Sequence, residues 1–414
     1  MNRRALLQNS FAAALAGSLP AFAQTGRKPR ILLRNGWQSI NIGDIAHPLG
    51  ILELMEKNGI DAEVRFWASN LENGAGELIQ KRFPKLIILE GQEQIDQAFK
   101  DCDFLLHGSG SGFVAQGHVA EWSKKTGKPY GIYGISFFDP KPGAVALLTG
   151  AQFVYFRESV SLKVAQDNGC KCPVMAFGPD SAFGVVTLRN DEAANAFLKA
   201  SGLEEGKFLC CIPRYRWTPF WTVKKGRPYD EVKDARNKEK VEHDHAPHRD
   251  AIISVVRETG MKVLICCEDQ TQIPLGKTIL FDPLPEDVKA KVVWRDKYWL
   301  TDEALSVYNK SAGLFGNEMH SPIMCISSGI PAVVCRWDEQ TTKGFMWRDI
   351  GLSEWLFTMD NEAEVSKIAP TVLAIAKDPA AAKAKAAKAR DLVLKLEEDH
   401  LKVLEGAVKK AAGV

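Results

Sequence analysis

The chain alternates short, continuous apolar runs with longer stretches in which apolar residues recur every three or four positions. The first pattern is typical of strands buried on both faces, and the second is typical of helices that cover them. The expected strands are residues 31–34, 62–67, 86–89, 102–107, 130–135 and 153–156, followed by 208–212, 262–267, 292–294, 312–315 and 332–335. Strands that alternate with helices predict parallel sheets with helices on both faces.

This alternation occurs twice, and 414 residues are enough for two domains of ordinary size. We expect one Rossmann-like domain over residues 30–190 and a second over residues 205–360, each with a parallel sheet, facing each other across a cleft. Residues 361–414 are rich in alanine and lysine and carry periodic leucines, so they should form long helices without a catalytic role.

The clearest unit spans residues 312–335. An apolar strand is followed by a helix expected over residues 318–328, and a second apolar strand follows. Gly329 favours the left-handed conformation that ends a helix, and Pro331 prevents a further turn. Apolar residues spaced by three and four predict the buried face of this helix: Met319, Ile323, Ile326 and Cys325.

Polar residues gather where the first strand of this unit meets its helix: Asn317, Glu318, His320 and Ser321. Ligands of parallel α/β sheets bind at the carboxyl ends of strands, beside helix N-termini. We therefore expect chemistry here, with Glu318 and His320 as an oriented acid/base pair and Ser321 in contact with substrate. The alternative is structural: Glu318 suits the dipole of a first helical turn, and Ser321 suits a cap.

Two loops of the first half resemble substrate-binding loops. Asn41 and Asp44 lie in a loop rich in glycine and asparagine after the first strand, and Gly108 and Ser109 begin a glycine turn after strand 102–107. The three-glycine spacing of a dinucleotide fingerprint is absent from the first loop. Arg157 opens a later helix and is a further candidate.

Basic and acidic side chains follow strands of the second half. Arg214 and Arg216 alternate with aromatic residues, a combination suited to an anionic sugar or phosphate, or to a solvated strand end. Lys343 is a second candidate for an anion contact. Glu268 follows strand 262–267 and suits either sugar hydroxyls, a cation or a helix cap.

Three histidines, His243, His245 and His248, lie in the charged stretch 224–249. They resemble a metal cluster but lack the spacing that places two ligands on one helical face. We expect this stretch to be a mobile lid or interdomain loop, followed by a helix over residues 250–259. No cofactor is expected.

Composition narrows the class of protein. A net charge of +2 with 25% charged residues does not suggest a nucleic-acid surface. The nine cysteines lie mostly in apolar runs, where buried thiols are expected. Residues 1–23 combine Arg3 and Arg4, an apolar stretch and a small-residue cleavage site, which predicts a twin-arginine-like export signal and a periplasmic or cell-envelope location; an uncleaved anchor is the alternative. No other segment is apolar enough to cross a membrane.

Together these pieces resemble the polysaccharide pyruvyl transferase family, whose two-domain fold is similar to GT-B glycosyltransferases. The matching motifs lie in order between residues 31 and 352: Asn41-Ile42-Gly43-Asp44, Gly108-Ser109-Gly110, Phe156-Arg157-Glu158-Ser159, Pro179-Asp180-Ser181-Ala182-Phe183, Arg214 and residues 316–320. The resemblance implies transfer of a pyruvyl ketal from phosphoenolpyruvate to two hydroxyls of a glycan. It also implies that His320 donates or relays a proton.

One position departs from the family pattern. An arginine that binds the anionic donor stands two residues before the histidine in the family, and Glu318 replaces it here. Arg214 and Arg216 are the expected substitutes. Three hypotheses follow: a pyruvyl transferase, a GT-B glycosyltransferase that uses a nucleotide sugar, and an exported glycan-binding protein without catalysis.

Overall fold

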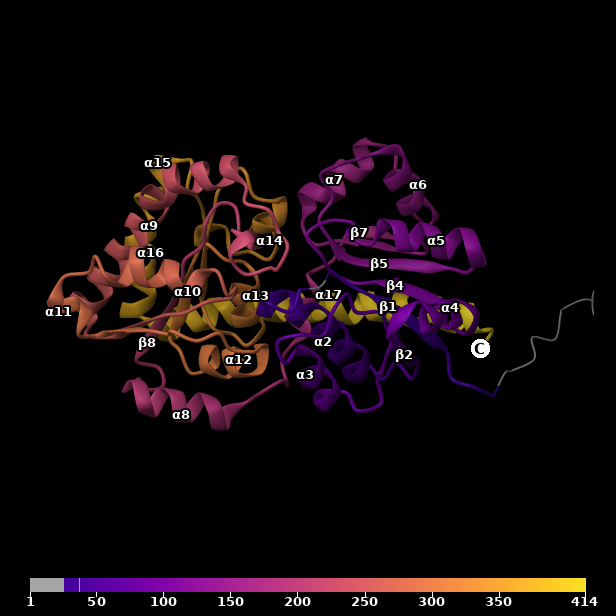
Figure 1. The fold of residues 1–414 in the computed structure, drawn as a ribbon, viewed down its shortest axis with the longest axis horizontal. Helices are drawn as coiled ribbons and strands as arrows, with labels where there is room; N and C mark the ends of the chain where they lie inside the picture. Colours follow the sequence, from indigo (N-terminus) through magenta and orange to yellow (C-terminus); the bar gives the residue numbers. More distant parts are fainter. Residues whose placement is uncertain (1–25, 37) are drawn as a thin grey trace, which may run out of the picture.

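Two parallel α/β sheets form the body of the protein, as predicted (Figure 1). The computed structural model describes residues 26–36 and 38–414, and within them the chain builds one sheet of seven strands and one of six. The first, in the order β3-β2-β1-β4-β5-β6-β7, contains β1 (Arg30–Arg34), β2 (Glu63–Phe66), β3 (Ile87–Ile88), β4 (Phe104–His107), β5 (Tyr130–Ile135), β6 (Val154–Phe156) and β7 (Met175–Phe177). The second, in the order β10-β9-β8-β11-β12-β13, contains β8 (Phe208–Ile212), β9 (Lys262–Ile265), β10 (Val292–Trp294), β11 (Gly313–Gly316), β12 (Ala332–Arg336) and β13 (Leu356–Thr358).

Helices connect consecutive strands, as the amphipathic stretches predicted. Those of the first half and the linker after it are α2 (Ile42–Lys57), α3 (Ala75–Arg82), α4 (Gly91–Asp101), α5 (Gln116–Thr126), α6 (Pro142–Gly150), α7 (Ser159–Asp167), the short η1 (Ser181–Gly184) and α8 (Asp191–Ser201). The second half has α9 (Glu231–Thr259), α10 (Gln272–Leu275), α11 (Glu286–Lys289), α12 (Thr301–Asn309), α13 (His320–Ser327), η4 (Thr342–Phe345), α14 (Met346–Asp349), α15 (Glu362–Val365), α16 (Ile368–Lys377) and α17 (Pro379–Ala412).

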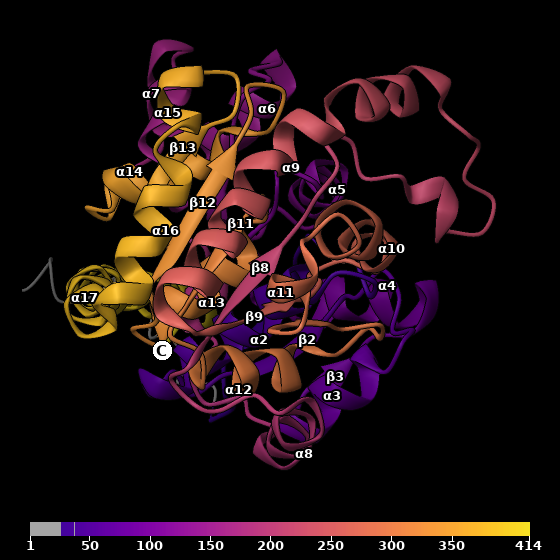
Figure 2. The same cartoon turned by 90° about the vertical axis from the view of Figure 1, so that its left-hand side faces the viewer.

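Both sheets reverse their strand order at one point. In the first sheet β1 lies between β2 and β4. In the second sheet β8 lies between β9 and β11, as Figure 2 shows. Connections leave such a point in opposite directions, and the crevice that opens at the carboxyl ends of the strands is where ligands bind in this class of fold. The loops after β1, β8 and β11 are therefore the ones that the fold places for function.

The two halves are joined at the start of α2. The amide of Ile42 donates to the carbonyl of Glu268 at 3.0 Å, and the hydroxyl of Thr301 donates to the carbonyl of Ile42 at 2.8 Å. Asn41 and Asp269 form an isolated antiparallel bridge across the same junction. The loop after β1 and the loop after β9 thus form one structural unit.

The expected long helix at the C-terminus is present and packs along the first half of the molecule. Helix α17 contacts α13 and also α2, β1 and β4, and it crosses behind both halves in Figure 1. Its buried residues recur at helical spacing: Ala382, Ala386, Ala389, Val393, Glu397, His400, Leu401, Leu404 and Val408. This helix therefore holds the two sheets in their relative position.

The prediction of a mobile lid or interdomain loop over residues 224–249 is wrong for most of this stretch. Residues 231–249 belong to α9, which begins at an N-cap where the side chain of Asp230 accepts from the amide of Lys233 at 3.1 Å. The dense charges resembled a solvated loop, but Asp244 is buried and pairs with Arg216 at 2.8 Å, which binds this part of the helix to the domain. The strands β7 and β13 were not predicted from the sequence.

The cysteines agree with the expectation of buried thiols: all nine are unpaired, and eight are buried. None of the described helices combines the length and the low charge that a membrane crossing requires. The predicted export signal lies outside the described residues and stays a prediction.

A carboxyl group on α17 should make stability depend on pH. Glu397 is buried, neither of its carboxylate oxygens has a hydrogen-bond partner, and burial raises its pKa to about 8. Between the ordinary glutamate pKa and pH 8, the carboxyl group of Glu397 keeps its proton in the folded state but loses it in the unfolded state. The free energy of unfolding therefore falls as pH rises through this range. We expect Glu397→Gln to melt roughly 5 °C above the wild type at pH 8.5 and the gap to narrow toward pH 5. Equal melting temperatures at pH 8.5 would contradict this.

A second prediction concerns the contact between α2 and α13. A Cβ on Gly43 would lie 2.1 Å from the Cβ of His320, so only glycine allows this approach. We expect Gly43→Ala to lower the melting temperature by roughly 2–5 °C because the His320 side chain must shift. The control is Gly117→Ala on α5, where a Cβ meets nothing within 4 Å; its melting temperature should stay the same or rise, since alanine favours helix. A Gly43→Ala protein as stable as the control would show that the contact is not tight.

Candidate active site

His320 lies at the start of α13, where the two halves meet, and it is held by the carboxylate of Glu268 from the loop after β9. Its Nδ1 lies 2.9 Å from Oε1 of Glu268, while Oε2 of Glu268 accepts from the amide and the hydroxyl of Ser321 at 2.7 and 2.9 Å. Glu268 therefore caps α13 and fixes the imidazole at the same time. This explains why the helix begins at His320 rather than at residue 318, as the sequence had suggested.

The protonation state of His320 follows from this environment. Burial, followed by the nearby charge of Lys343, holds the pKa of His320 well below its usual value, so the ring is neutral at pH 7. With its Nδ1 hydrogen donated to Glu268, its Nε2 carries a lone pair. That nitrogen is buried and has no hydrogen-bond partner. Such an imidazole is prepared to accept a proton from a bound hydroxyl.

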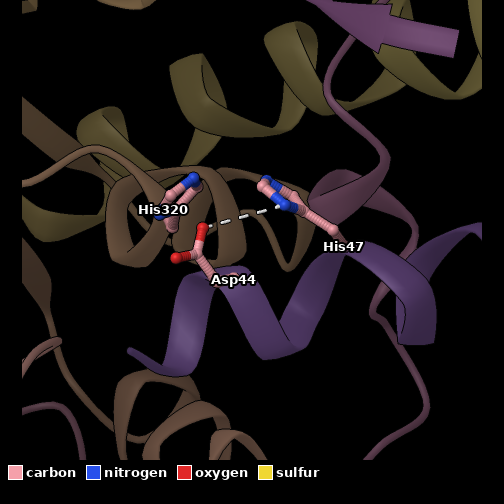
Figure 3. A group of neighbouring side chains, drawn as sticks. All are labelled: Asp44, His47 and His320. Carbon is pink, nitrogen blue, oxygen red and sulfur yellow. Dashed lines mark ion pairs between the residues drawn. The ribbon is translucent and has the colours of Figure 1, made fainter. Parts of the chain in front are cut away.

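A second histidine, His47 on α2, faces His320 from the other half of the molecule (Figure 3). The two ring centroids are 4.9 Å apart, and the rings meet edge to face. Nε2 of His47 lies 3.3 Å from Oδ1 of Asp180, close enough for an ion pair though without the angle of a hydrogen bond, and Nδ1 lies 3.9 Å from Asp44. Burial favours the neutral ring, but Asp180 and then Asp44 outweigh it and raise the pKa of His47.

The same residues are the candidate metal ligands of the described chain. One ligand atom from each of Asp44, His47 and His320 lies within 4.8 Å of the other two. Two imidazoles and a carboxylate form a donor set that zinc accepts. A metal would require the ligating nitrogen of each imidazole to be unprotonated. The carboxylates of Asp180 and Asp44 instead favour the protonated form of His47.

Glu318, which replaces the expected arginine, is paired with an arginine from another strand. Oε1 of Glu318 lies 3.3 Å from Nε of Arg214, which follows β8, and accepts from Nε2 of Gln272 at 2.5 Å. Burial raises the pKa of Glu318, and Arg214 opposes that rise. Arg214 is partly exposed, so its remaining donors are available to a ligand. The positive charge missing at position 318 is thus present in the site.

Lys343 is a buried cation. It lies in η4, is only 8% exposed, and forms no hydrogen bond or ion pair within the described residues. Burial lowers the pKa of its ammonium, and the carboxylate of Glu318 opposes this. The other charges that act on it are those of Arg214, Arg157 and Glu268, so it lies inside the same cluster. A buried ammonium without a partner is costly, and an anionic ligand would remove that cost.

Arg157 lies behind His47 and supports it. Its Nη1 donates to Oδ2 of Asp180 at 2.8 Å, and its Nε donates to the hydroxyl of Ser136 at 2.9 Å. Burial raises the pKa of Asp180, but the charges of His47 and Arg157 hold it well below the usual value, so Asp180 is ionised. The neighbouring Glu158 accepts from the hydroxyl of Thr342, on the loop that carries Lys343, at 2.5 Å.

Four predicted residues have structural contacts rather than free groups. The side chain of Asn41 caps α2 by accepting from the amides of Gly43 and Asp44 at 2.8 and 3.1 Å. Ser109 accepts from the amide of Ser181 at 2.8 Å, and a Cβ on Gly108 would lie 2.2 Å from Asn35. The fourth, Arg216, is buried in an ion-pair network with Asp244, Asp360 and Glu339.

The three histidines of α9 do not form a metal cluster. His243 lies 2.9 Å from both Asp244 and Glu362. His245 accepts from the amide of Arg214 at 3.3 Å, and His248 lies 2.8 Å from the side-chain oxygen of Asn317. The latter two support the loops after β8 and β11. Burial lowers their pKa values to about 4 and about 3, so both are neutral at pH 7.

The cluster contains several residues that the sequence pattern singled out and a second imidazole, His47, that it did not. The structure brings together His320, Glu318, Ser321, Glu268, Arg214, Lys343, Asp44 and Arg157. His47 was missed because nothing in the sequence paired it with His320. The available signal was its position three residues after Asp44, on the same face of a helix that follows a loop already considered functional.

Comparison with solved structures agrees with this fold. The structure of Anabaena Alr3699/HepE in complex with UDP and glucose is 12% identical, with a TM-score of 0.55 over 92% of this chain and all of that one (100%). The structure of S. aureus MnaA with UDP is 11% identical, with a TM-score of 0.55 over 91% of this chain and 98% of that one. At this identity the similarity is one of fold. No curated protein matches the sequence significantly.

The family comparison is more specific. The model of the family described as polysaccharide pyruvyl transferase matches residues 41–339, a range that begins at the cap of α2, includes Glu268 and His320, and ends just after β12, before Lys343. The match covers most of the chain and every strand of the two sheets except β1 and β13. The chain therefore belongs to the polysaccharide pyruvyl transferase family.

Proposed function

We propose that this protein transfers a pyruvyl ketal from phosphoenolpyruvate to two hydroxyls of a glycan or its precursor. Family membership supports the transferase activity. The observation that supports the donor is the buried, unpaired ammonium of Lys343 within the cluster of Arg214 and Glu318. Phosphoenolpyruvate carries a phosphate and a carboxylate, the two groups that such a cation would bind.

Arg214 and Lys343 supply the positive charge that the replacement at position 318 removes. A planar guanidinium suits a two-oxygen contact with phosphate or carboxylate, while an ammonium acts as a point charge. Because both lie in a largely buried environment, their attraction for an anion is weakened less by water than it would be at the surface. Glu318 then holds Arg214 in place instead of contacting the donor.

His320 is suited to remove the proton of an acceptor hydroxyl as that oxygen bonds to the donor. Its Nδ1 is fixed by Glu268, so its Nε2 keeps one orientation and one protonation state. A glycan with two neighbouring hydroxyls provides both bonds of the ketal. The acceptor is thus the sugar, and the anionic donor lies on the side of Arg214 and Lys343.

A nucleotide-sugar glycosyltransferase is the competing function, because two structures with this fold were determined with UDP. A glycan-binding protein without catalysis is the third possibility. The three functions differ in the anion that the site must bind. A glycosyltransferase requires a nucleoside diphosphate, and a glycan-binding protein requires neither that anion nor phosphoenolpyruvate.

Calorimetric titration with phosphoenolpyruvate, and separately with UDP, tests the proposal. We expect phosphoenolpyruvate to bind and UDP not to bind. Arg214→Ala and Lys343→Met should each weaken binding by about 10- to 100-fold, the loss of one hydrogen bond to a charged group. The matched control is Lys395→Met, at an exposed position of α17, which should bind as the wild type does. Binding of UDP alone would replace the proposal with the glycosyltransferase, and binding of neither would indicate the glycan-binding protein.

A further inference from the structure

We propose that the segment between β8 and α9, residues 213–230, binds the glycan acceptor and that this acceptor carries negative charge. The inference rests on the proposed function and adds the surface that receives its second substrate. It is carried by aromatic rings and unpaired cations that gather beside the donor cluster. Figure 2 shows this segment, in pink, and the first turns of α9 projecting from the body of the molecule.

Aromatic side chains are concentrated and accessible in this segment. Trp217 is 38% exposed and Tyr229 is 59% exposed. Phe220 and Trp221, which belong to the short helix η2 (Phe220–Thr222), are half-buried. Exposed apolar rings beside a crevice indicate a binding surface rather than a core. Sugar rings fit such a surface, because their C–H faces pack against aromatic faces while their hydroxyls stay in water.

The first turns of α9 hold these rings in place. The amide of Trp217 donates to the side-chain oxygen of Asn237 at 2.9 Å, and the side-chain nitrogen of Asn237 donates to the carbonyl of Trp217 at 2.7 Å. The hydroxyl of Tyr229 donates to Asp234 at 2.7 Å. Trp221 meets Tyr229 edge to face, with the ring centroids 5.6 Å apart. Since the rings are already ordered, a rigid ligand that stacks on them loses little further entropy.

The charge of the segment indicates an anionic ligand. Residues 206–229 include no aspartate or glutamate, although 51 of the 414 residues of the chain are acidic. Arg214 and Arg216 are already ion-paired. Lys225 and Arg227 are exposed, and in the described part of the chain neither side chain forms an ion pair or a hydrogen bond. Carboxylate or phosphate groups on a glycan would complement these two cations.

Lys224 connects this surface to the crevice between the two halves. Its ammonium donates to the side-chain oxygen of Gln38, which lies in the loop after β1. Burial and then the charge of Arg227 lower the pKa of Lys224, whereas the nearby carboxylate of Asp44 raises it. Asp44 is also a neighbour of His320. A glycan that lies on the segment is therefore continuous with the position where its hydroxyls would react.

An anionic membrane is the other partner that aromatic and basic side chains fit. Two observations favour the glycan. Trp217 and Tyr229 are fixed by hydrogen bonds to α9, whereas side chains that insert among lipids need no such order. The segment also continues into the crevice through Lys224, a direction that leads to the site and not to a flat surface.

Affinity electrophoresis with two soluble polymers tests the inference: alginate, which has a carboxylate on every sugar unit, and dextran, which is uncharged. We expect alginate to retard the wild type more strongly than dextran does. The affinity for alginate should fall as salt is added, because exposed charges are screened. Trp217→Ala should weaken it by about 10-fold, as truncation of an aromatic anchor does, and Trp217→Phe, which keeps an aromatic face, should stay within about threefold of the wild type.

Lys225→Met combined with Arg227→Met should weaken alginate binding and reduce its dependence on salt. The matched control is Lys388→Met combined with Lys395→Met, at exposed positions of α17, which should bind alginate as the wild type does. Each of these variants should bind phosphoenolpyruvate as the wild type does by calorimetry, because none of the changed side chains belongs to the donor cluster.

Four results would overturn the inference. A wild type that alginate does not retard, or variants of the segment that bind alginate unchanged, would remove this surface from the glycan site. Binding to phosphatidylglycerol vesicles without binding to alginate would make it a membrane-docking surface. Weaker phosphoenolpyruvate binding by Trp217→Ala would reduce the segment to a support of the donor cluster. By contrast, a wild type that binds alginate and not phosphoenolpyruvate would contradict the proposed function and leave the glycan-binding surface in place.

Discussion

The hydrogen bond between Glu268 and His320 is the interaction on which the site depends. Glu268 follows β9, and its backbone carbonyl accepts from the amide of Ile42 while its side chain holds both His320 and the first turn of α13. One buried carboxylate therefore fixes the imidazole of His320 and the helix behind it. Its backbone belongs to the junction that places α2, and with it His47, against the same ring.

The charges around this bond are arranged in two groups. Arg214 and Glu318 are paired, while Lys343 is buried beside them without a partner. On the other side His47, Asp180 and Arg157 alternate in sign. A buried charge is costly unless it is compensated. The second group compensates its own charges, whereas Lys343 in the first group has no partner, which is why we propose that the first group binds the anionic donor.

The fold could be predicted because parallel sheets leave a strong pattern. Residues 130–135, 208–212 and 292–294 were assigned to strands with the bounds that the structure shows. Helix α9 could not be predicted over residues 231–249, because its helical character depends on buried ion pairs such as Asp244 with Arg216.

The candidate site was predictable where one motif carries its residues, as at Glu318, His320 and Ser321. It was not predictable where residues from distant segments meet. His47 and His320 are far apart in the sequence, and their contact depends on Gly43, whose lack of a side chain lets the two helices approach. Glu318 and Arg214 are also far apart in the sequence, and their ion pair could not be predicted from it. This pair places an arginine beside position 318, where the family arginine is absent. Charge compensation of this type is visible only when the strands are in place.

The most direct test of the account is a crystal structure of the protein with phosphoenolpyruvate bound. We expect an oxygen of the phosphate or carboxylate to lie within hydrogen-bond distance of Lys343 and Arg214. A donor bound elsewhere on the molecule, or one that leaves the ammonium of Lys343 without a partner, would contradict the assignment of this cluster as the active site.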